Sequence, residues 1–372
     1  MSERTLKVHV PKPSEAPPPN TTGVVGWLRT NLLSSPFNIA LTLAGFYLLF
    51  ETIPPILDWA ISSAAWSGET YNDCKDAGGA CWSFVNAKWD LFIYGFYPTD
   101  QYWRVDVVWL LLAVTFAPQF FPVSDRVKKY LGVFAVTGLP LFAGILLVGG
   151  VFGMPLVETR FWGGFTLNVV LAFVGIVAAL PIGVLLALGR RSAMPAVRAI
   201  CVGFIEIWRG VPLITVLFMA SVMLPLFLPE GSNKLDKLLR AMIGIIMFQS
   251  AYMAEVVRGG LQAISKGQYE AAEALGLNYP MKMGLIVLPQ ALKIVIPGIV
   301  NTFIELFKDT TLVLVIGLLD VLASVNATIS DPAWGNVATE GYIFAGLCFW
   351  IFCFGMSHYS RGLEKKLNTS RR

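Results

Sequence analysis

Long apolar stretches alternate with short polar segments along most of this chain. A helix that crosses a bilayer needs about 20 apolar residues, and eight stretches have roughly that length or more. They cover residues 37–57, 107–122, 131–151, 166–188, 200–228, 241–257, 298–320 and 341–357. The pattern therefore predicts an all-α polytopic membrane protein with about eight transmembrane helices.

Two of these stretches depart from a simple span. Residues 107–122 are short and contain Pro118, so a re-entrant or interfacial segment is the alternative there. Residues 200–228 are too long for one straight helix, and the sequence Arg209-Gly210-Val211-Pro212 interrupts them. We expect a break at that point, with the first third of the stretch at the membrane interface.

Composition agrees with a membrane protein and excludes a soluble one. Hydrophobic residues make up 55% of the chain and charged residues 14%, whereas soluble domains carry about 25% charged residues. The net charge of +4 is too small for a nucleic-acid-binding protein. Two His and five Cys leave little material for a metal site, and none is predicted.

The placement of Lys and Arg predicts the orientation. One set of alternate connections, which includes both termini, holds 18 basic residues, and the opposite set of almost equal length holds 7. Basic residues favour the cytoplasmic side, so both termini are predicted to be cytoplasmic. Residues 1–35, Pro-rich and polar at their start, are expected to form a disordered cytoplasmic tail, and residues 368–372 a second tail.

The same orientation places residues 58–106 outside, as a periplasmic loop. Cys74 and Cys81 lie in a polar, Gly-rich part of this loop, at a spacing that a disulfide could close. The sequence does not decide between a disulfide and two free thiols. A disulfide would persist in an oxidising compartment.

A predicted cytoplasmic loop, residues 259–283, carries the most informative motif. Glu270 to Leu275 is a run of good helix formers, and Gly276 suits the left-handed position that ends a helix. Two alanines give one face of this helix small side chains, which would allow the helix to enter a groove on another protein. For a Glu-Ala-Ala triplet by itself, an ordinary loop helix is the alternative.

The complete pattern is Glu-Ala-Ala, three residues, Gly, nine residues, Ile, one residue, Leu-Pro. It resembles the EAA loop of ABC importer permeases, which docks into a cleft of the ATPase subunit. The resemblance implies an ATPase-docking loop that contains Gly267, Gln268, Glu270, Ala271, Ala272, Gly276, Leu288 and Pro289.

Neighbouring motifs are similar to those of the polar amino-acid permeases, the histidine/glutamine-type family. They are Glu206-Ile-Trp-Arg209-Gly210-Val-Pro212-Leu213, Ala251-Tyr252-Met-Ala-Glu255-Val-Val-Arg258-Gly259-Gly260, Leu288-Pro289-Gln290-Ala291 and Lys308-Asp309-Thr310-Thr311-Leu312. The resemblance implies a five-span core over residues 161–367. The preceding residues 36–160, with three extra spans, are similar to the long permeases of the general L-amino-acid transporter, in particular its M-type subunit.

This resemblance also implies partners. They are ABC ATPase subunits, a second permease subunit, which is expected to be a related long one, and a periplasmic amino-acid-binding protein. No Gly-x-x-x-x-Gly-Lys-Ser/Thr sequence occurs in the chain, so ATP and Mg are expected on the ATPase partner. We expect no cofactor and no enzymatic activity in this chain, which is predicted to be a multi-pass protein of the cell inner membrane.

Ionisable residues inside spans are functional candidates, because burying them is costly. Three oppositely charged pairs are spaced three residues apart, so each could neutralise itself on one helix face. The pairs are Glu206 with Arg209, Glu255 with Arg258, and Glu305 with Lys308. For the first two pairs, a structural or gating role is favoured over contact with substrate.

Near the predicted midplane, Glu305, Lys308, Asp309, Thr310 and Thr311 form a candidate translocation path. An amino acid is a zwitterion, and this set offers partners for its ammonium and its carboxylate. Helix-packing ion pairs are the alternative.

The sequence therefore predicts the transmembrane permease subunit of an ATP-driven importer that moves amino acids from periplasm to cytoplasm. The alternative is an ion-coupled secondary amino-acid transporter, which would use buried carboxylates and inverted repeats. Buried carboxylates are present, but no convincing repeat is visible and the EAA pattern has no role in such a protein.

Overall fold

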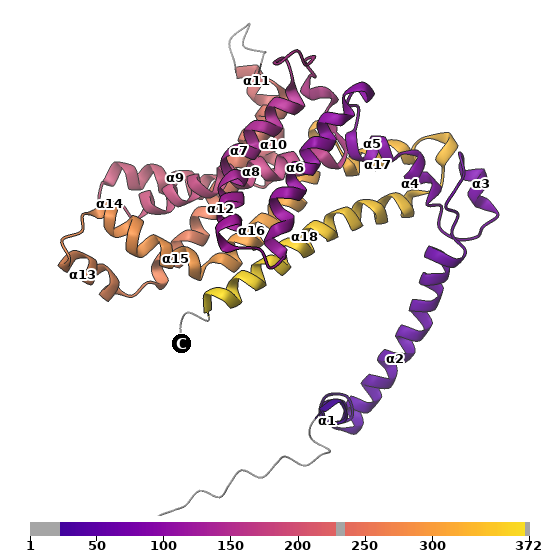
Figure 1. Cartoon of the computed structure of the whole chain (residues 1–372), viewed down its shortest axis with the longest axis horizontal. Helices are drawn as coiled ribbons and strands as arrows, with labels where there is room; N and C mark the ends of the chain where they lie inside the picture. The colour runs from indigo at the N-terminus through magenta and orange to yellow at the C-terminus, as the bar shows by residue number, and fades with distance from the viewer. Residues whose placement is uncertain (1–22, 228–234, 369–372) are drawn as a thin grey trace, which may run out of the picture. The chain divides into compact units, whose positions relative to one another are not determined.

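The computed structural model describes residues 23–227 and 235–368 (Figure 1). Nearly all regular structure in these residues is helical, as predicted, and the exception is a two-residue strand, β1 (Leu319–Asp320). The predicted tails fall largely on residues 1–22 and 369–372, which lie outside the described residues. The chain divides into two compact units.

The first unit comprises, within the described residues, 23–65 and 74–80. It contains α1 (Gly23–Asn31), α2 (Pro36–Leu57) and the π-helical turn η2 (Asp58–Ser62). Ser35 caps α2, because its side chain accepts a hydrogen bond from the Asn38 amide at 3.2 Å. Helix α1 corrects the expectation of a tail without structure through residue 35, since Val24, Trp27 and Leu28 give this segment apolar helical spacing.

Several short helices follow α2 before the next long helices begin. The helices from here to the start of the predicted core are α3 (Tyr71–Lys75), α4 (Ser83–Ala87), α5 (Trp89–Tyr94), η3 (Thr99–Gln101), α6 (Tyr102–Phe120), α7 (Asp125–Val148) and η4 (Thr159–Phe161). The stretch predicted at 107–122 is part of a continuous 22-residue helical segment, residues 99–120, that is long and apolar enough to cross a membrane. A continuous helix of this length contradicts the re-entrant alternative, and the interfacial alternative is not tested.

The second unit comprises, within the described residues, 66–73, 81–227 and 235–368. The predicted core is built from helices that belong to this unit. They are α8 (Gly164–Arg190), α9 (Pro195–Gly210), α10 (Leu213–Phe218), η5 (Met219–Met223), α11 (Leu224–Phe227), α12 (Lys237–Ala263), α13 (Lys266–Ala274), α14 (Tyr279–Met281), η6 (Lys282–Val287), α15 (Leu288–Ile294), α16 (Ile296–Asp309), η7 (Thr310–Ile316), α17 (Val321–Ile329), η8 (Pro332–Trp334) and α18 (Ala338–Asn368).

The described residues contain six helices long and apolar enough to span a membrane, or eight if two bent pairs each form one span. One pair bends by 102° between Gly210 and Leu213, which confirms the break predicted there. The other bends by 64° at Val295. The span predicted over 298–320 begins just after this bend, and α16 with η7 covers it as far as Ile316, where Gly317 in the left-handed conformation ends η7. The bend arises where α15 ends and Pro297 opens the first turn of α16.

Close packing of α8 against α12 forms the centre of the second unit. Gly183 of α8 faces Met253 of α12, and a Cβ at Gly183 would lie 2.7 Å from the Met253 side chain. A Cβ at Gly175 would likewise lie 2.9 Å from the side chain of Leu306 of α16. Small residues at such positions let transmembrane helices approach one another closely. This helix pair positions both the α13 loop and the charged cluster described next.

Candidate functional site

Helix α13 is the Glu-Ala-Ala segment, and it is a short helix that ends as the sequence predicts. Its last turn closes with a hydrogen bond from the Gly276 amide to the Glu273 carbonyl at 2.9 Å, and another joins Leu277 to Ala272. Gly276 has φ +74°, the left-handed conformation that glycine adopts without strain. The Asn278 side chain then accepts from the Met281 amide at 3.1 Å and starts the return to the membrane region.

Side-chain contacts tie α13 to the helices around it. The Tyr269 hydroxyl donates to the Leu261 carbonyl of α12 at 3.3 Å. It also accepts a 3.2 Å hydrogen bond from Arg191, at the end of α8, whose guanidinium lies 5.7 Å from the Tyr269 ring centroid. On the other side, Gln290 of α15 donates to Gln268 at 2.9 Å. Lys282 of η6 pairs with Glu273. Four neighbouring segments therefore hold this helix.

The outward face of α13 contains four of the eight predicted docking residues. Gly267, Gln268, Glu270 and Ala271 are exposed, but Ala272 is only 2% exposed and packs inward. Apolar side chains that the motif did not include extend this surface, because four of them on the same loop and helix turn are exposed: Leu275 at 76%, Tyr279 at 53%, Met281 at 44% and Leu285 at 67%. The sequence could not assign them, because exposure depends on how η6 packs.

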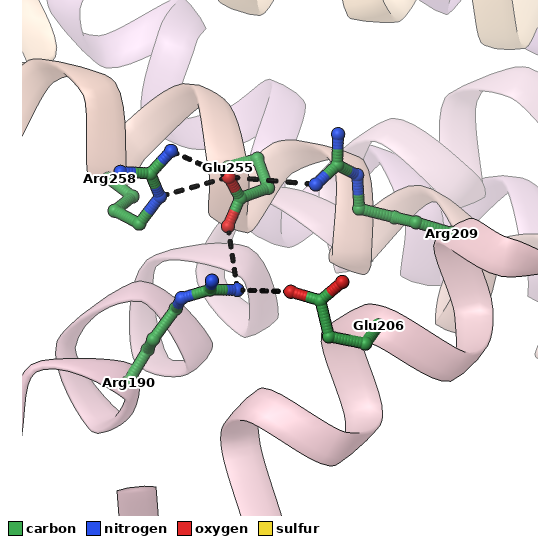
Figure 2. Close-up of polar contacts among 5 residues, drawn as sticks. All are labelled: Arg190, Glu206, Arg209, Glu255 and Arg258. Carbon is green, nitrogen blue, oxygen red and sulfur yellow. Dashed lines mark hydrogen bonds and ion pairs between the residues drawn. The ribbon is translucent and has the colours of Figure 1, made fainter.

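A second group of polar residues centres on Glu255 of α12 (Figure 2). Its carboxylate lies 2.8 Å from Arg258 and 3.0 Å from Arg190, and its distance to Arg209 is 3.6 Å. The Glu255 side chain is 15% exposed, so water screens these contacts only in part. Arg190 also reaches Glu206 at 3.0 Å, which completes a five-residue charged cluster.

The charged cluster joins three helices rather than neutralising each helix by itself. The predicted pair of Glu255 with Arg258 forms within α12. The predicted pair of Glu206 with Arg209 does not form, because Glu206 contacts Arg190 of α8 and Arg209 reaches α12, where it also lies 5.5 Å from the Tyr252 ring. Three guanidinium groups face two carboxylates, so the cluster carries one excess positive charge.

Charges on α16 are arranged differently. Glu305 and Lys308 are exposed and Asp309 is half-buried. Across the parts of the chain that the structure describes, none of the three forms an ion pair. The predicted pair of Glu305 with Lys308 is therefore wrong for this structure. The nearby Thr311 hydroxyl donates to the Lys308 carbonyl at 2.9 Å.

Thr310 belongs to a buried hydrogen-bond network and not to an accessible surface. It is 0% exposed; its hydroxyl donates to the Phe307 carbonyl at 2.7 Å and accepts from Asn168 at 2.9 Å. Asn168 also donates to Asp320, which caps α17 by accepting from the Ala323 amide at 2.9 Å. The network fixes α8, η7 and α17 together.

The five cysteines differ in state. Cys74 and Cys81 are 3% and 2% exposed, and both are disulfide-bonded. Cys201, Cys348 and Cys353 are free thiols. Among residues 23–227 and 235–368, no group of three His, Cys, Asp or Glu side chains could hold a metal ion.

Comparison with known proteins adds a family and several relatives. A family model described as binding-protein-dependent transport system inner membrane component matches residues 179–369. The inner membrane amino-acid ABC transporter permease protein YhdY of Escherichia coli is 54% identical over 368 residues, which covers 99% of each chain. The glutamate/glutamine/aspartate/asparagine transport system permease protein BztC of Rhodobacter capsulatus is 40% identical, with 97% of each chain covered.

Among solved structures, a crystal structure of an amino acid ABC transporter with histidines matches 55% of this chain and 92% of its own chain. The sequence identity is 27% and the TM-score 0.48.

Proposed function

This chain belongs to the family of binding-protein-dependent transport system inner membrane components, and we propose that it carries amino acids across the inner membrane as the permease subunit of an ATP-driven importer. Membership confirms the family predicted from the motifs. Relatives that align over almost the whole length of this chain are permeases of amino-acid transport systems. They support the choice of amino acids as cargo.

The observation that carries the proposal is the construction of α13. A short helix presents Glu270 and Ala271 outward, while Tyr269, Gln268 and Glu273 tie it to α8, α12, α15 and η6. An ordinary loop helix would not need ties to four segments that include two spans. We therefore assign Gly267, Gln268, Glu270, Ala271, Gly276 and the neighbouring Pro289 to the surface that receives the ATPase, with Ala272 and Leu288 supporting it.

The family implies an ATPase and a substrate-binding protein as partners, and we add a second, related permease subunit that completes the transmembrane pathway. ATP and its Mg bind on the ATPase. We keep residues 161–367 as the permease core and residues 36–160 as an N-terminal extension. The bias of 18 to 7 basic residues supports cytoplasmic termini and a periplasmic position for residues 58–106.

We assign two roles to the charged groups. The charged cluster around Glu255 links α8, α9 and α12 at the α13 side of these helices, so we propose that it acts as a gate whose contacts change when α13 moves. Glu305, Lys308 and Asp309 lack ion-pair partners in the described residues, so they are available to a zwitterionic cargo, with the Thr311 hydroxyl beside them. The buried hydrogen bonds of Thr310 to Phe307 and Asn168 hold this segment in place.

Replacing Gly276 with Val tests the docking surface. A side chain at φ +74° is strained, with a cost of about 1 kcal/mol that rises for a β-branched residue. Open space surrounds the position, so no other contact is lost. We expect weaker retention of the ATPase in a pull-down and reduced amino-acid uptake, with normal abundance of the permease in the membrane.

Gly362→Val is the matched control, because Gly362 of α18 also has open space around it but has no positive φ. Glu270→Lys completes the set: it keeps the helix and reverses the charge of its outer face. If Gly276→Val and Glu270→Lys both retain the ATPase and transport normally, the docking assignment fails. Uptake that persists without any ATPase would favour the ion-coupled secondary transporter instead.

Cysteine labelling tests the proposed orientation. Cys74 and Cys81 are expected to react with a membrane-impermeant maleimide in intact spheroplasts only after reduction, because a disulfide protects them. A Cys-free background with these two residues restored removes the signal from Cys201, Cys348 and Cys353. Labelling that needs permeabilised cells would place residues 58–106 on the cytoplasmic side.

A further inference from the structure

An apolar cavity of about 460 Å³ lies where the extension meets the permease core. Helices α6 and α7 form one side of it, and α8 and α12 form the other. Its lining includes Leu112, Ala143, Gly144, Val170, Phe173 and Met242. Along α8 it runs from Thr166 to Val174, a length of about 12 Å at 1.5 Å per residue. This size is typical of pockets that hold an organic ligand.

The chemistry of the lining excludes water and the amino-acid cargo. A buried water needs two to four polar partners, but the Thr166 hydroxyl already donates to the Ile93 carbonyl at 2.7 Å and accepts from Trp109 at 3.1 Å. The buried Trp162 Nε1 has no partner among the described residues, and this one donor is fewer than a water needs. At one end, Thr159 and Asp236 are hydrogen-bonded to each other. A zwitterion placed among the remaining apolar groups would lose its hydration without replacement. The cavity is therefore not part of the proposed translocation path.

The surroundings of the cavity indicate what fills it. Leu141 and Leu239 line it and are 67% and 44% exposed, so it opens at the surface of the helix bundle. Both belong to helices long and apolar enough to span the membrane. In a bilayer the Leu141 side of this opening faces hydrocarbon, and the Leu239 side lies near the membrane surface, because the predicted span begins at residue 241. An unfilled apolar volume of this size would forfeit many packing contacts and destabilise the fold.

We propose that this cavity is a binding site for one acyl chain of a membrane phospholipid. The chain enters between α7 and α12, lies along α8, and leaves its headgroup outside the cavity. Helices α6 and α7 precede residues 179–369, the part that matches the family model, so the site belongs to the long form of the permease. The bound chain joins the extension to the core by filling the space between them.

Photo-cross-linking in the intact importer complex tests the site without any substitution. The complex is placed in nanodiscs that contain phosphatidylethanolamine with a diazirine in one acyl chain. It is exchanged into probe-free detergent to remove loosely held lipid, and then irradiated. We expect adducts on the cavity segments, residues 139–148 and 238–242, and few on Leu185 of α8, which is 68% exposed but lies outside the cavity.

A matched pair of variants on α7 sharpens the test. A Cβ at Gly144, which lines the cavity, or at Gly132, which does not, meets no atom within 4 Å. Gly144→Leu places a side chain where the acyl chain would lie, and we expect about a tenfold loss of adducts. Gly132→Leu should keep them. Size-exclusion chromatography shows that both complexes are intact.

Three outcomes would overturn the proposal. One is equal labelling of Leu185 and the cavity segments in the wild-type complex. The other is an unchanged adduct yield in Gly144→Leu. The third is a complete absence of adducts when another subunit covers the cavity residues, because a protein contact would then occupy the place of the acyl chain.

Discussion

The charged cluster around Glu255 and the charges on α16 have similar sequence patterns, but in the structure the first group is ion-paired and the second is not. Glu255 has three arginines within 3.6 Å and a side chain that is 15% exposed. Glu305 and Lys308 have the same three-residue spacing as Glu255 and Arg258, yet both are exposed and form no ion pair with any described residue. Spacing on a helix therefore permits an ion pair without determining it.

The two arrangements suit the two groups of charges to different roles. Charges that satisfy one another across three helices stabilise a particular arrangement of those helices. Charges without partners contribute little to the arrangement and remain available to a ligand. The charged cluster is thus suited to holding a conformation, whereas contact of the α16 charges with the cargo is part of the proposed function.

Glu255→Gln is expected to have the largest effect. It leaves Arg190, Arg209 and Arg258 without the carboxylate at their centre, and losing one partner of a buried pair is strongly destabilising. Because Glu255 is partly exposed, we expect a loss of about 2 kcal/mol and a thermal midpoint lower by about 5 °C. Differential scanning fluorimetry of the purified complex measures this. An unchanged midpoint would show that the charged cluster does not stabilise the fold.

Lys308→Met should affect transport and spare stability. Lys308 is exposed and unpaired within the described residues, so we expect a thermal midpoint within about 1 °C of wild type and basal ATP hydrolysis that continues. Uptake should fall by about tenfold, because the cargo carboxylate loses its cationic partner. Uptake of a labelled amino acid into vesicles measures it, with Lys308→Arg as the charge-conserving control. Wild-type uptake in Lys308→Met would remove this residue from the path.

Glu206→Gln should have the smallest effect. Its side chain is 58% exposed and its contact is with Arg190, which keeps Glu255 as a second partner. An exposed ion pair contributes about 0–1 kcal/mol, so we expect a stability loss under about 0.5 kcal/mol. The same fluorimetry compares it with Glu255→Gln. A loss as large as that of Glu255→Gln would mean that the five residues act as one unit.

Hydropathy and helix signals predicted much of the fold. All eight apolar stretches correspond to a helix or a bent helix pair, and the break before Leu213 lies where Gly210 and Pro212 indicate it. The left-handed Gly276 is a local property of the chain and was also predictable. The bend at Val295 was missed, because a Pro in a first helical turn is compatible with a straight span as well.

Side-chain partners were far less predictable. Arg190 was not a candidate, because its contact with Glu255 depends on how α8 and α12 rotate against each other. Thr310 looked like part of the path, but η7 turns its hydroxyl toward Asn168, which lies 142 residues earlier in the chain. Such contacts between distant segments are set by packing, which one sequence pattern does not describe.

The ties around α13 have a mechanical consequence. A helix held at one end only would rotate about that end when displaced, and the displacement would not be transmitted to the spans. Tyr269 and Gln268 attach α13 near its start, and Glu273 attaches it near its end. Because α13 is held near both ends, we expect it to move as a rigid body. A small displacement of its outer face would then be transmitted to α8, α12 and α15 together.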